Sequence, residues 1–244
     1  MRQFGLIGYP LSHSFSKKYF TEKFSTEGIS NCNYELYPIS SIDQFPTLLS
    51  GVDGLEGINV TIPYKEEVLT YLDHQSTAVK EIGACNCIKI KDGELTGYNT
   101  DVLGFRQSFE PFVKPHHQQA LVLGTGGAAK AVVWVLKQMG IAYKYVSRKK
   151  TEDLLSYDDL DETIMQQYQV VINTTPLGMQ PNVQDKPSLP YQFINNTHLC
   201  YDLVYNPAKT AFLQLAEERG ATIKNGGDML LIQAEESWKI WNAE

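Results

Sequence analysis

The sequence ALVLGTGGA, residues 120–128, decides the fold of this chain. Its first four residues form an apolar run typical of a buried strand, and residues 128–139 have the composition of a helix. Glycines between a strand and a helix let backbone amides approach a diphosphate closely, with the positive end of the helix dipole facing the anion. The stretch therefore predicts a dinucleotide site whose turn consists of Gly124, Thr125, Gly126, Gly127 and Ala128.

The same turn leaves other interpretations open. It reads G-x-G-G-A rather than G-x-G-x-x-G, and glycine-rich turns also serve helix packing or bind other nucleotide-like ligands such as S-adenosylmethionine. Its position favours a two-domain enzyme, because about 120 residues precede it, which is enough for a separate substrate domain.

Composition narrows the class of protein. The chain has 244 residues, is 43 % hydrophobic and 20 % charged, and so can bury one large core or two smaller ones. Its net charge of −7 argues against a nucleic-acid partner. The apolar run before Pro10 is too short for a signal peptide or a membrane span, and no later run approaches that length. Cys32, Cys85, Cys87 and Cys200 have neither disulfide nor zinc-site spacing, so we expect free thiols in the cytoplasm and no metal.

Strand-like and helix-like segments alternate along the whole chain, which predicts α/β architecture with largely parallel sheets. In the first half, strands are expected at 4–8, 33–37 and 57–61, helices at 16–24, 42–49 and 64–72, and a hairpin around Asp92-Gly93. In the second half, strands are expected at 120–123, 143–147, 170–174, 199–205 and 222–224, with helices from 127, near 207–218 and at 228–241. The last helix carries one apolar face, so it must pack against another part of the chain.

Polar residues follow the first predicted strand, where loops of parallel sheets line ligand crevices. Ser14 and Ser16 are candidate donors for a carboxylate or a hydroxyl-rich ligand, although either serine also suits a helix N-cap. His13 is a candidate acid–base residue, although a structural role is the more common one for a lone histidine.

A lysine and an aspartate are the strongest candidates for chemistry. Lys65 follows the strand that ends at Thr61, and Asp101 follows the predicted hairpin. Taken singly, Lys65 suits a solvated helix position and Asp101 a helix cap. Brought into one cleft, the carboxylate would hold the ammonium in place and favour an acid–base role for the lysine.

Several motifs in order resemble the shikimate dehydrogenase family. They are GYPLSHSFS at 8–16, NVTIPYK at 59–65, GACN at 83–86, NTDVLG at 99–104, NTTPLGM at 173–179, YDLVY at 201–205 with Pro207 and Thr210, and Met229, Leu230 and Gln233. The resemblance extends across both halves of the chain. It implies an N-terminal α/β substrate-binding domain, a Rossmann-type domain and a cleft between them.

The resemblance also implies the domain limits and the roles of the residues. Residues 1–101 would form the substrate-binding catalytic domain, with the helix at about 229–244 packing back onto it, and residues 102–228 the NADP-binding domain. Lys65 would be the acid–base residue paired with Asp101. Substrate would contact Ser14, Ser16, Thr61, Asn86, Asp101, Tyr205 and Gln233. The cofactor would contact the 124–128 turn, Ser147, Arg148, Lys149, Leu203 and Gly226.

The residues after the second strand of the nucleotide fold indicate which cofactor is bound. An NAD enzyme usually has a carboxylate there, whereas this chain has Ser147-Arg148-Lys149 and no carboxylate before Glu152. Arg148 suits a 2′-phosphate and Lys149 adds positive charge, although a solvated basic turn would read the same. The family's usual N-R-T is S-R-K here.

The resemblance therefore implies an oxidoreductase that reversibly reduces 3-dehydroshikimate to shikimate with NADPH, in chorismate and aromatic amino acid biosynthesis. Two alternatives stay open at this point: an NAD-using quinate/shikimate dehydrogenase, and a catalytically silent dinucleotide-binding regulatory module. The expected partner is the small-molecule substrate, with no nucleic acid or membrane, and the protein is expected to be a monomer or a homodimer.

Overall fold

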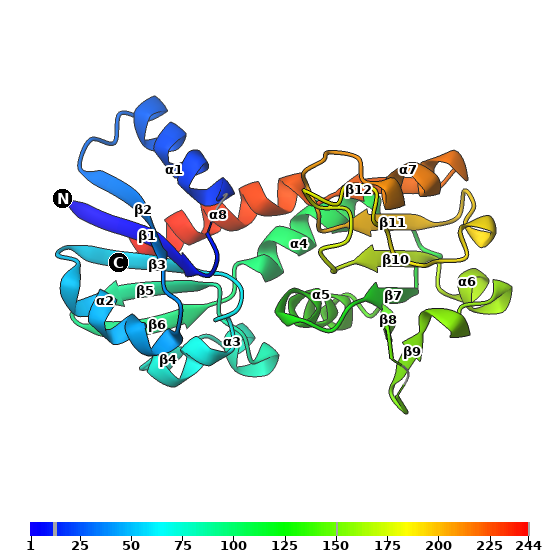
Figure 1. The fold of residues 1–244 in the computed structure, drawn as a ribbon, viewed down its shortest axis with the longest axis horizontal. Coiled ribbons are helices and arrows are strands. Elements are labelled where there is room, and N and C mark those ends of the chain that lie inside the picture. The colour runs from blue at the N-terminus through cyan, green and yellow to red at the C-terminus, as the bar shows by residue number, and fades with distance from the viewer. Residues whose placement is uncertain (12–13, 150, 244) are drawn as a thin grey trace. The chain divides into compact units, whose positions relative to one another are not determined.

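The chain folds into two compact units, described here from a computed structural model. The structure describes residues 1–11, 14–149 and 151–243. Unit 1 comprises Met1–Thr100 and Gln233–Glu244, and unit 2 comprises Asp101–Ile232 (Figure 1). Each unit is built on its own six-stranded sheet.

The sheet of unit 1 has the strand order β2-β1-β3-β5-β6-β4. Its strands are β1 (Arg2–Gly8), β2 (Cys32–Pro38), β3 (Leu55–Val60), β4 (His74–Gln75), β5 (Cys87–Lys91) and β6 (Glu94–Tyr98). The strands β2, β1 and β3 are parallel, whereas β5 runs antiparallel to both β3 and β6. The predicted hairpin is confirmed: Asp92 and Gly93 join β5 to β6 with φ angles of 54° and 85°.

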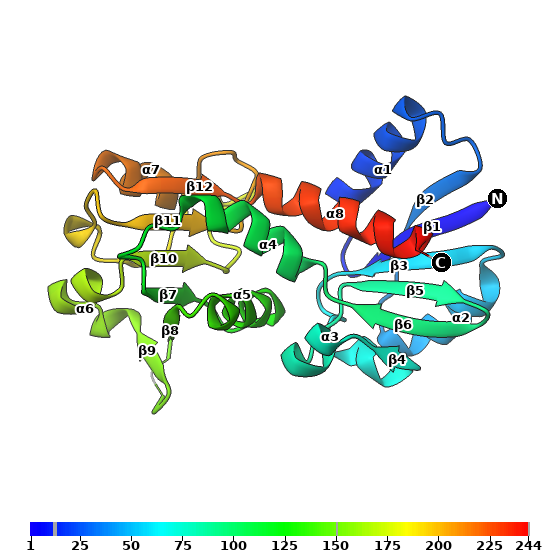
Figure 2. The same ribbon diagram turned by 180° about the vertical axis from the view of Figure 1, so that it is seen from behind.

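Helices cover both faces of this sheet (Figures 1 and 2). On one face, α1 (Phe15–Thr26) and α8 (Gly227–Asn242) pack on β1, where Phe4, Phe20, Ala234 and Trp241 form a core cluster. On the other face lie α2 (Phe45–Gly51), α3 (Thr77–Ile82) and two 3₁₀ helices, η1 (Ile42–Gln44) and η2 (Glu67–Tyr71).

The helix expected at 64–72 is wrong. Residues 62–66 form turns, and only the short 3₁₀ helix η2 follows. The apolar spacing that suggested a helix is real, because Tyr64 and Val68 are both buried. Tyr64 donates its hydroxyl to Ile39 O at 2.6 Å, and its amide closes a turn on Thr61 O at 3.0 Å. These anchors hold the segment as turns directly after β3.

The sheet of unit 2 is parallel throughout, with the order β12-β11-β10-β7-β8-β9. Its strands are β7 (Gln119–Leu123), β8 (Ala142–Ser147), β9 (Leu154–Ser156), β10 (Val170–Asn173), β11 (Leu199–Asp202) and β12 (Thr222–Asn225). Numbered within the unit and read from β9, the order is 3-2-1-4-5-6, which defines the Rossmann fold. The predicted Rossmann-type domain is thereby confirmed.

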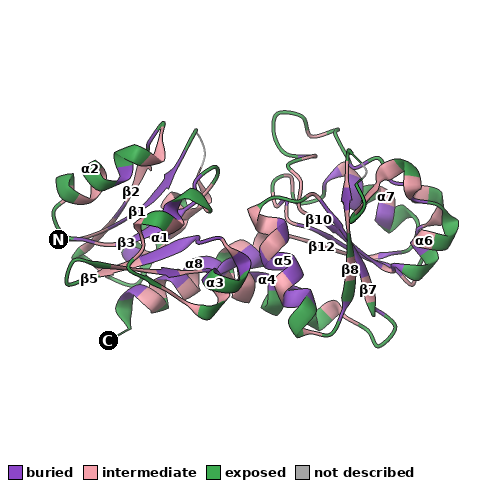
Figure 3. Ribbon diagram, turned by 90° about the horizontal axis from the view of Figure 1, so that it is seen from below, coloured by how far each residue is buried: buried purple, intermediate pink, exposed green. Residues whose placement is uncertain are grey.

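Two layers of helices enclose this sheet (Figure 3). The helices α4 (Asp101–Phe109) and α5 (Gly127–Gln138) pack on one face, and α6 (Glu162–Gln167) and α7 (Ala211–Glu218) on the other. The connections of this unit include the 3₁₀ helices η3 (Glu110–Phe112), η4 (Tyr157–Asp159) and η5 (Tyr191–Phe193). Among the residues that the structure describes, no helix has the length and apolarity to cross a membrane.

The glycine turn has the geometry that the sequence predicts. β7 ends at Leu123, α5 begins at Gly127, and Gly124 has a φ of 101°, in the left-handed region that favours glycine. A Cβ atom on Gly124 would lie 2.9 Å from Thr174 Oγ1. The turn therefore requires glycine both for its backbone angle and for the close approach of the loop after β10.

Candidate functional site

Ser14 and Ser16 lie at the N-terminus of α1, directly after β1. The Ser14 side chain caps the helix by accepting a hydrogen bond from Lys17 N at 3.3 Å. The cap uses an acceptor lone pair of the hydroxyl and leaves its proton able to be donated to a ligand. Burial raises the pKa of the Tyr34 hydroxyl, and the nearby side chain of Ser16 lowers it in part. Ser12 and His13, which complete the motif, lie outside the described residues, so the candidate role of His13 stays a prediction.

Thr61 and Lys65 follow β3, next to the end of β1. Thr61 N donates to Ile7 O at 2.9 Å, and a Cβ atom on Gly8 would lie 2.4 Å from the Thr61 methyl group. The glycine therefore permits a close approach between the two strand ends. The carbonyl of Lys65 accepts a hydrogen bond from Cys85 N at 2.8 Å, which ties the lysine to the segment that carries Asn86.

Asn86 is fixed by hydrogen bonds on both sides of its amide. Its Nδ2 donates to Thr100 Oγ1 at 3.0 Å, and its Oδ1 accepts from Thr100 N at 2.6 Å. Asn86 is 3 % exposed and Thr100 is 2 % exposed, so water competes little for these bonds. The interaction also fixes the backbone immediately before Asp101.

The network continues into α8 and across the sheet. Asn59 donates its Nδ2 to Ser237 Oγ at 3.0 Å and accepts from Tyr34 Oη at 2.9 Å. Ser237 lies 3.3 Å from Thr100 Oγ1 and donates to Gln233 O at 2.9 Å. Thr100 Oγ1 also lies 3.5 Å from Gln233 Oε1. A continuous set of buried polar side chains thus positions Asn86 and Gln233, two of the predicted substrate contacts.

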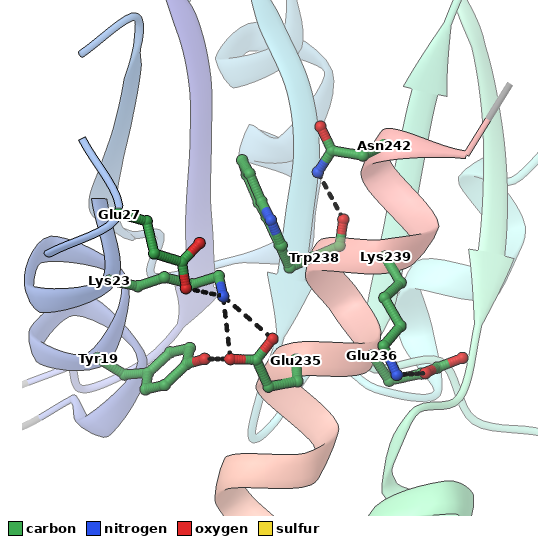
Figure 4. Close-up of polar contacts among 8 residues, drawn as sticks. All are labelled: Tyr19, Lys23, Glu27, Glu235, Glu236, Trp238, Lys239 and Asn242. Atoms are coloured by element: carbon green, nitrogen blue, oxygen red, sulfur yellow. Dashed lines mark hydrogen bonds and ion pairs between the residues drawn. The ribbon is translucent and has the colours of Figure 1, made fainter. Parts of the chain in front are cut away.

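An ionic cluster joins α1 to α8 next to this network (Figure 4). Lys23, whose side chain is 8 % exposed, lies 2.7 Å from Glu27 Oε1 and 3.1 Å from Glu235 Oε1. The hydroxyl of Tyr19 also donates to Glu235. Ser14 and Ser16 begin α1, and Gln233 lies two residues before Glu235, so the cluster links the helices that carry three predicted substrate contacts.

Asp101 begins α4 and is 8 % exposed. It belongs to unit 2, although the preceding Thr100 is part of the unit 1 network. Asn99 donates to Ala84 O at 2.9 Å, and its buried Oδ1 accepts no hydrogen bond from the residues that the structure describes. A ligand donor would find an acceptor there.

A cavity of about 560 Å³ opens at the carboxyl ends of β7, β8 and β10 in unit 2. This is the point at which the strand order reverses, where Rossmann folds bind their ligands. Four predicted cofactor residues line it: Gly124, Thr125, Ser147 and Arg148. The other lining residues are Val146, Tyr157, Thr175, Pro176, Leu177, Asp185, Lys186 and Ser188.

The residues beside the cavity fit a dinucleotide. Gly126 is the N-cap of α5, where no side chain of the described residues provides a cap and the first turn contains no acidic residue. The amides of Gly127 and Ala128 therefore begin a helix whose N-terminus suits an anion. The volume of the cavity lies within the range of small-molecule sites, and Arg148 supplies a cation beside it.

Six predicted cofactor residues are absent from the described lining of this cavity: Gly126, Gly127, Ala128, Lys149, Leu203 and Gly226. Lys149 is exposed on the turn after β8. A Cβ atom on Gly226 would lie 2.1 Å from Leu203 O, so only glycine fits beside that carbonyl. Tyr205, a predicted substrate contact, is half-buried, and burial raises its pKa.

A buried carboxylate orders the loops after β10 and β11. Asp202 accepts hydrogen bonds from Asn173 Nδ2 at 2.9 Å, Val204 N at 3.0 Å and Thr210 Oγ1 at 2.6 Å. Burial raises the pKa of Asp202 to about 6, although these hydrogen bonds lower it in part. Its partners come from two of the motifs, NTTPLGM and YDLVY with Thr210, so this carboxylate explains residues that contact no predicted ligand.

Asp228, close to the start of the last helix, forms an ion pair with Lys224. It also lies in the first turn of α8, where the helix dipole favours an acidic side chain.

Sequence reasoning missed several residues of the site. Thr100 and Ser237 belong to the buried network, and Asp185, Lys186 and Ser188 line the cavity. The position of Ser237, four residues after Gln233, was a usable signal, because residues at that spacing share a helix face. The cavity residues gave no such signal, since their loop has no sequence period.

Known proteins resemble this chain over its whole length. The NADP(+) shikimate dehydrogenase of Caldicellulosiruptor saccharolyticus is 35 % identical over 260 residues, covering 99 % of this chain and 92 % of the relative. This chain belongs to the shikimate dehydrogenase family. A family model described as the shikimate dehydrogenase substrate binding domain matches residues 6–88.

Solved structures of the shikimate dehydrogenase family agree. The enzyme of Aquifex aeolicus is 33 % identical with a TM-score of 0.87, covering 99 % of this chain and 92 % of that chain. The shikimate 5-dehydrogenase of Thermus thermophilus, solved in complex with NADP(H) and shikimate, is 28 % identical with a TM-score of 0.87, covering 99 % and 94 %. The family resemblance and the fold class predicted from the sequence are thus confirmed.

Proposed function

We propose that this protein is an NADP-dependent shikimate dehydrogenase, an oxidoreductase that reversibly reduces 3-dehydroshikimate to shikimate with NADPH. The observation that carries the proposal is the nearly full-length relationship to NADP(+) shikimate dehydrogenases. A structure of the same fold at 28 % identity holds both NADP(H) and shikimate. The reaction belongs to aromatic amino acid biosynthesis, and we place it in the cytoplasm, in a monomer or a homodimer.

In this proposal, unit 1 is the substrate-binding domain. Ser14 and Ser16 donate hydrogen bonds to the carboxylate of shikimate from the start of α1. Thr61, Asn86, Asp101, Tyr205 and Gln233 contact its hydroxyl groups. The buried hydrogen bonds of Asn86 with Thr100 support this role, because they fix the orientation of an amide that must match a hydroxyl.

Lys65 is the acid–base residue. It gives a proton to the oxygen of the reacting carbonyl during reduction and takes it back during oxidation. Asp101 holds the ammonium group in place. Backbone and side-chain hydrogen bonds connect the segments that carry the two residues. Cys85 N donates to Lys65 O, and Thr100 N, directly before Asp101, donates to the side chain of Asn86.

Unit 2 binds the cofactor. The cavity at the reversal of strand order, the uncapped N-terminus of α5 and the Arg148 side chain fit a dinucleotide with a 2′-phosphate. Bound NADPH supplies the hydride that reduces the ring carbonyl. Leu203 and Gly226 contact the cofactor in this proposal, and Lys149 adds positive charge near Arg148.

The experiment is a turnover assay at the absorbance band of the reduced nicotinamide. The protein is mixed with shikimate or quinate and with NADP⁺ or NAD⁺, in all four combinations. We expect reduction that requires shikimate and prefers NADP⁺. A preference for quinate or NAD⁺ would contradict the proposal and favour a quinate/shikimate dehydrogenase. Absence of turnover in folded protein that binds NADPH would favour a silent regulatory module.

A further inference from the structure

The cavity in unit 2 carries positive charge from two separate segments of the chain. Arg148 lies on the turn after β8, and Lys186 lies on the long connection between β10 and β11. Both side chains are exposed, and neither forms an ion pair within the described part of the chain. Two cations lining one cavity without internal partners are available to an anionic ligand.

The segment around Lys186 is held firmly although its tip is exposed. Pro187 and Leu189 are buried, and Leu189 contributes to the core of unit 2. The carbonyl of Pro187 accepts hydrogen bonds from Leu189 N at 2.8 Å and from Tyr191 Oη at 2.8 Å. The backbone of Lys186 is therefore fixed next to the cavity, and only its flexible side chain remains to be ordered on binding.

The turn after β8 departs from the pattern of the family. The usual N-R-T is S-R-K here, so the threonine hydroxyl beside the arginine is replaced by Lys149. Lys149 is exposed, but the described lining of the cavity contains Lys186 instead. Asp185 also lines the cavity, so its carboxylate would oppose a phosphate bound by Arg148 alone.

We propose that Lys186, together with Arg148, binds the 2′-phosphate of NADP and determines the preference for NADP over NAD. The inference rests on the proposed function, which places an NADP 2′-phosphate at this cavity. The 2′-phosphate carries up to two negative charges, which a single arginine beside Asp185 would neutralise poorly. A lysine acts as a point charge toward phosphate and needs no fixed geometry, which suits its exposed position.

The test measures binding of 2′,5′-ADP and of 5′-AMP by calorimetry, with wild type, Lys186→Gln, Arg148→Gln and Lys144→Gln. The last is a matched control, because Lys144 is an exposed lysine on β8 outside the described lining of the cavity. Loss of one charge-assisted hydrogen bond should weaken 2′,5′-ADP about tenfold in K186Q and leave 5′-AMP unchanged. K144Q should bind both ligands as wild type does.

The outcomes separate this inference from the proposed function. Equal weakening of both ligands in K186Q would place the lysine at the adenosine or the 5′-phosphate that both ligands share, and would overturn the inference. Unchanged binding of both in K186Q, with wild type still preferring 2′,5′-ADP, would also overturn it while leaving NADP as the cofactor. A wild-type protein that does not distinguish the two ligands would contradict the proposed use of NADP itself. The same variants assayed for turnover should change the ratio of kcat/KM between NADP⁺ and NAD⁺ in the same proportion.

Discussion

The two units hold their proposed ligand-binding residues in opposite ways. In unit 1, Asn86 and Gln233 are 3 % and 7 % exposed and belong to one buried network. In unit 2, Arg148 and Lys186 are exposed at the mouth of a cavity. A set of hydroxyl groups must be matched by donors and acceptors of fixed orientation, whereas a phosphate can be bound by point charges. The side chains held rigidly are therefore those that we propose to recognise the hydroxyl groups of the substrate.

Unit 2 also contains a buried polar group, but it serves the fold. Asp202 accepts hydrogen bonds from Asn173, Val204 and Thr210 and so fixes the loops after β10 and β11. The comparison is therefore between a buried network that positions the side chains proposed to bind substrate and one that positions backbone. Each of the following variants tests one side of this contrast.

The largest effect is expected at Lys65. Lys65→Met removes the proposed acid–base group, and removal of such a group lowers kcat by roughly two to four orders of magnitude. The KM for shikimate should change far less, because the substrate contacts of the network remain. The measurement is steady-state kinetics in both reaction directions.

The control for this variant is Lys80→Met, at an exposed lysine on α3 in the same unit. It should retain kcat. A Lys65→Met protein with kcat near that of wild type would show that the proton is handled elsewhere.

The next effect is a pH dependence of stability caused by Asp202. Because burial raises its pKa from 3.8 to about 6, the folded chain holds a proton that the unfolded chain releases between these values. The free energy of unfolding contributed by this group is therefore present below about pH 4 and is lost as the pH rises through about 6. The loss amounts to at most about 3 kcal/mol.

Asp202→Asn isolates this contribution. The amide can accept from Asn173 and Val204 and donate to Thr210, so the hydrogen bonds of the carboxylate are retained. Denaturant unfolding at a series of pH values should give a curve for wild type that falls, relative to D202N, between about pH 4 and pH 6. Parallel curves for the two proteins would disprove the raised pKa.

The smallest effect is expected where α1 meets α8. Glu235→Gln removes a carboxylate that binds Lys23 and Tyr19, and should lower the free energy of unfolding by about 1 kcal/mol or less because Glu235 is partly exposed. It should also raise the KM for shikimate a few-fold, since Gln233 lies two residues earlier in the same helix. The free energy of unfolding is measured by denaturant unfolding, and the KM for shikimate by steady-state kinetics.

The next residue along α8 supplies the matched control. Glu236 pairs with Lys239 at 3.4 Å, and the Lys239 side chain is 69 % exposed (Figure 4). Glu236→Gln should leave the KM for shikimate unchanged. An equal KM change in both variants would mean that any charge lost from α8 has this effect, and that the cluster has no positioning role.

Much of the fold could be predicted because local signals and tertiary structure agree. The glycine turn at 124–128 predicted β7 and α5, and Asp92-Gly93 predicted the β5–β6 hairpin. The last helix was predicted at 228–241 and spans Gly227–Asn242. In each case the backbone conformation depends on residues within a few positions of one another, which a sequence displays directly.

The errors and omissions came from contacts between distant residues. Tyr64 binds Ile39 O, and that anchor changed the expected helix into turns. Ser237 and Thr100 meet although 137 positions separate them, and Lys186 and Arg148 line one cavity only through the strand order of unit 2. Such contacts leave no period or motif in one sequence. The roles of Lys65, Asp101 and the other site residues come from the family resemblance and stay predictions.

One measurement tests the division between the two units most directly: the KM for shikimate and the KM for NADP⁺ in Gln233→Leu and in Arg148→Gln. The account predicts that Q233L raises the KM for shikimate about tenfold and leaves that for NADP⁺ near wild type, because it removes one buried hydrogen-bonding group. R148Q should do the reverse, by about tenfold or more. A comparable rise in both KM values in either variant would contradict the account.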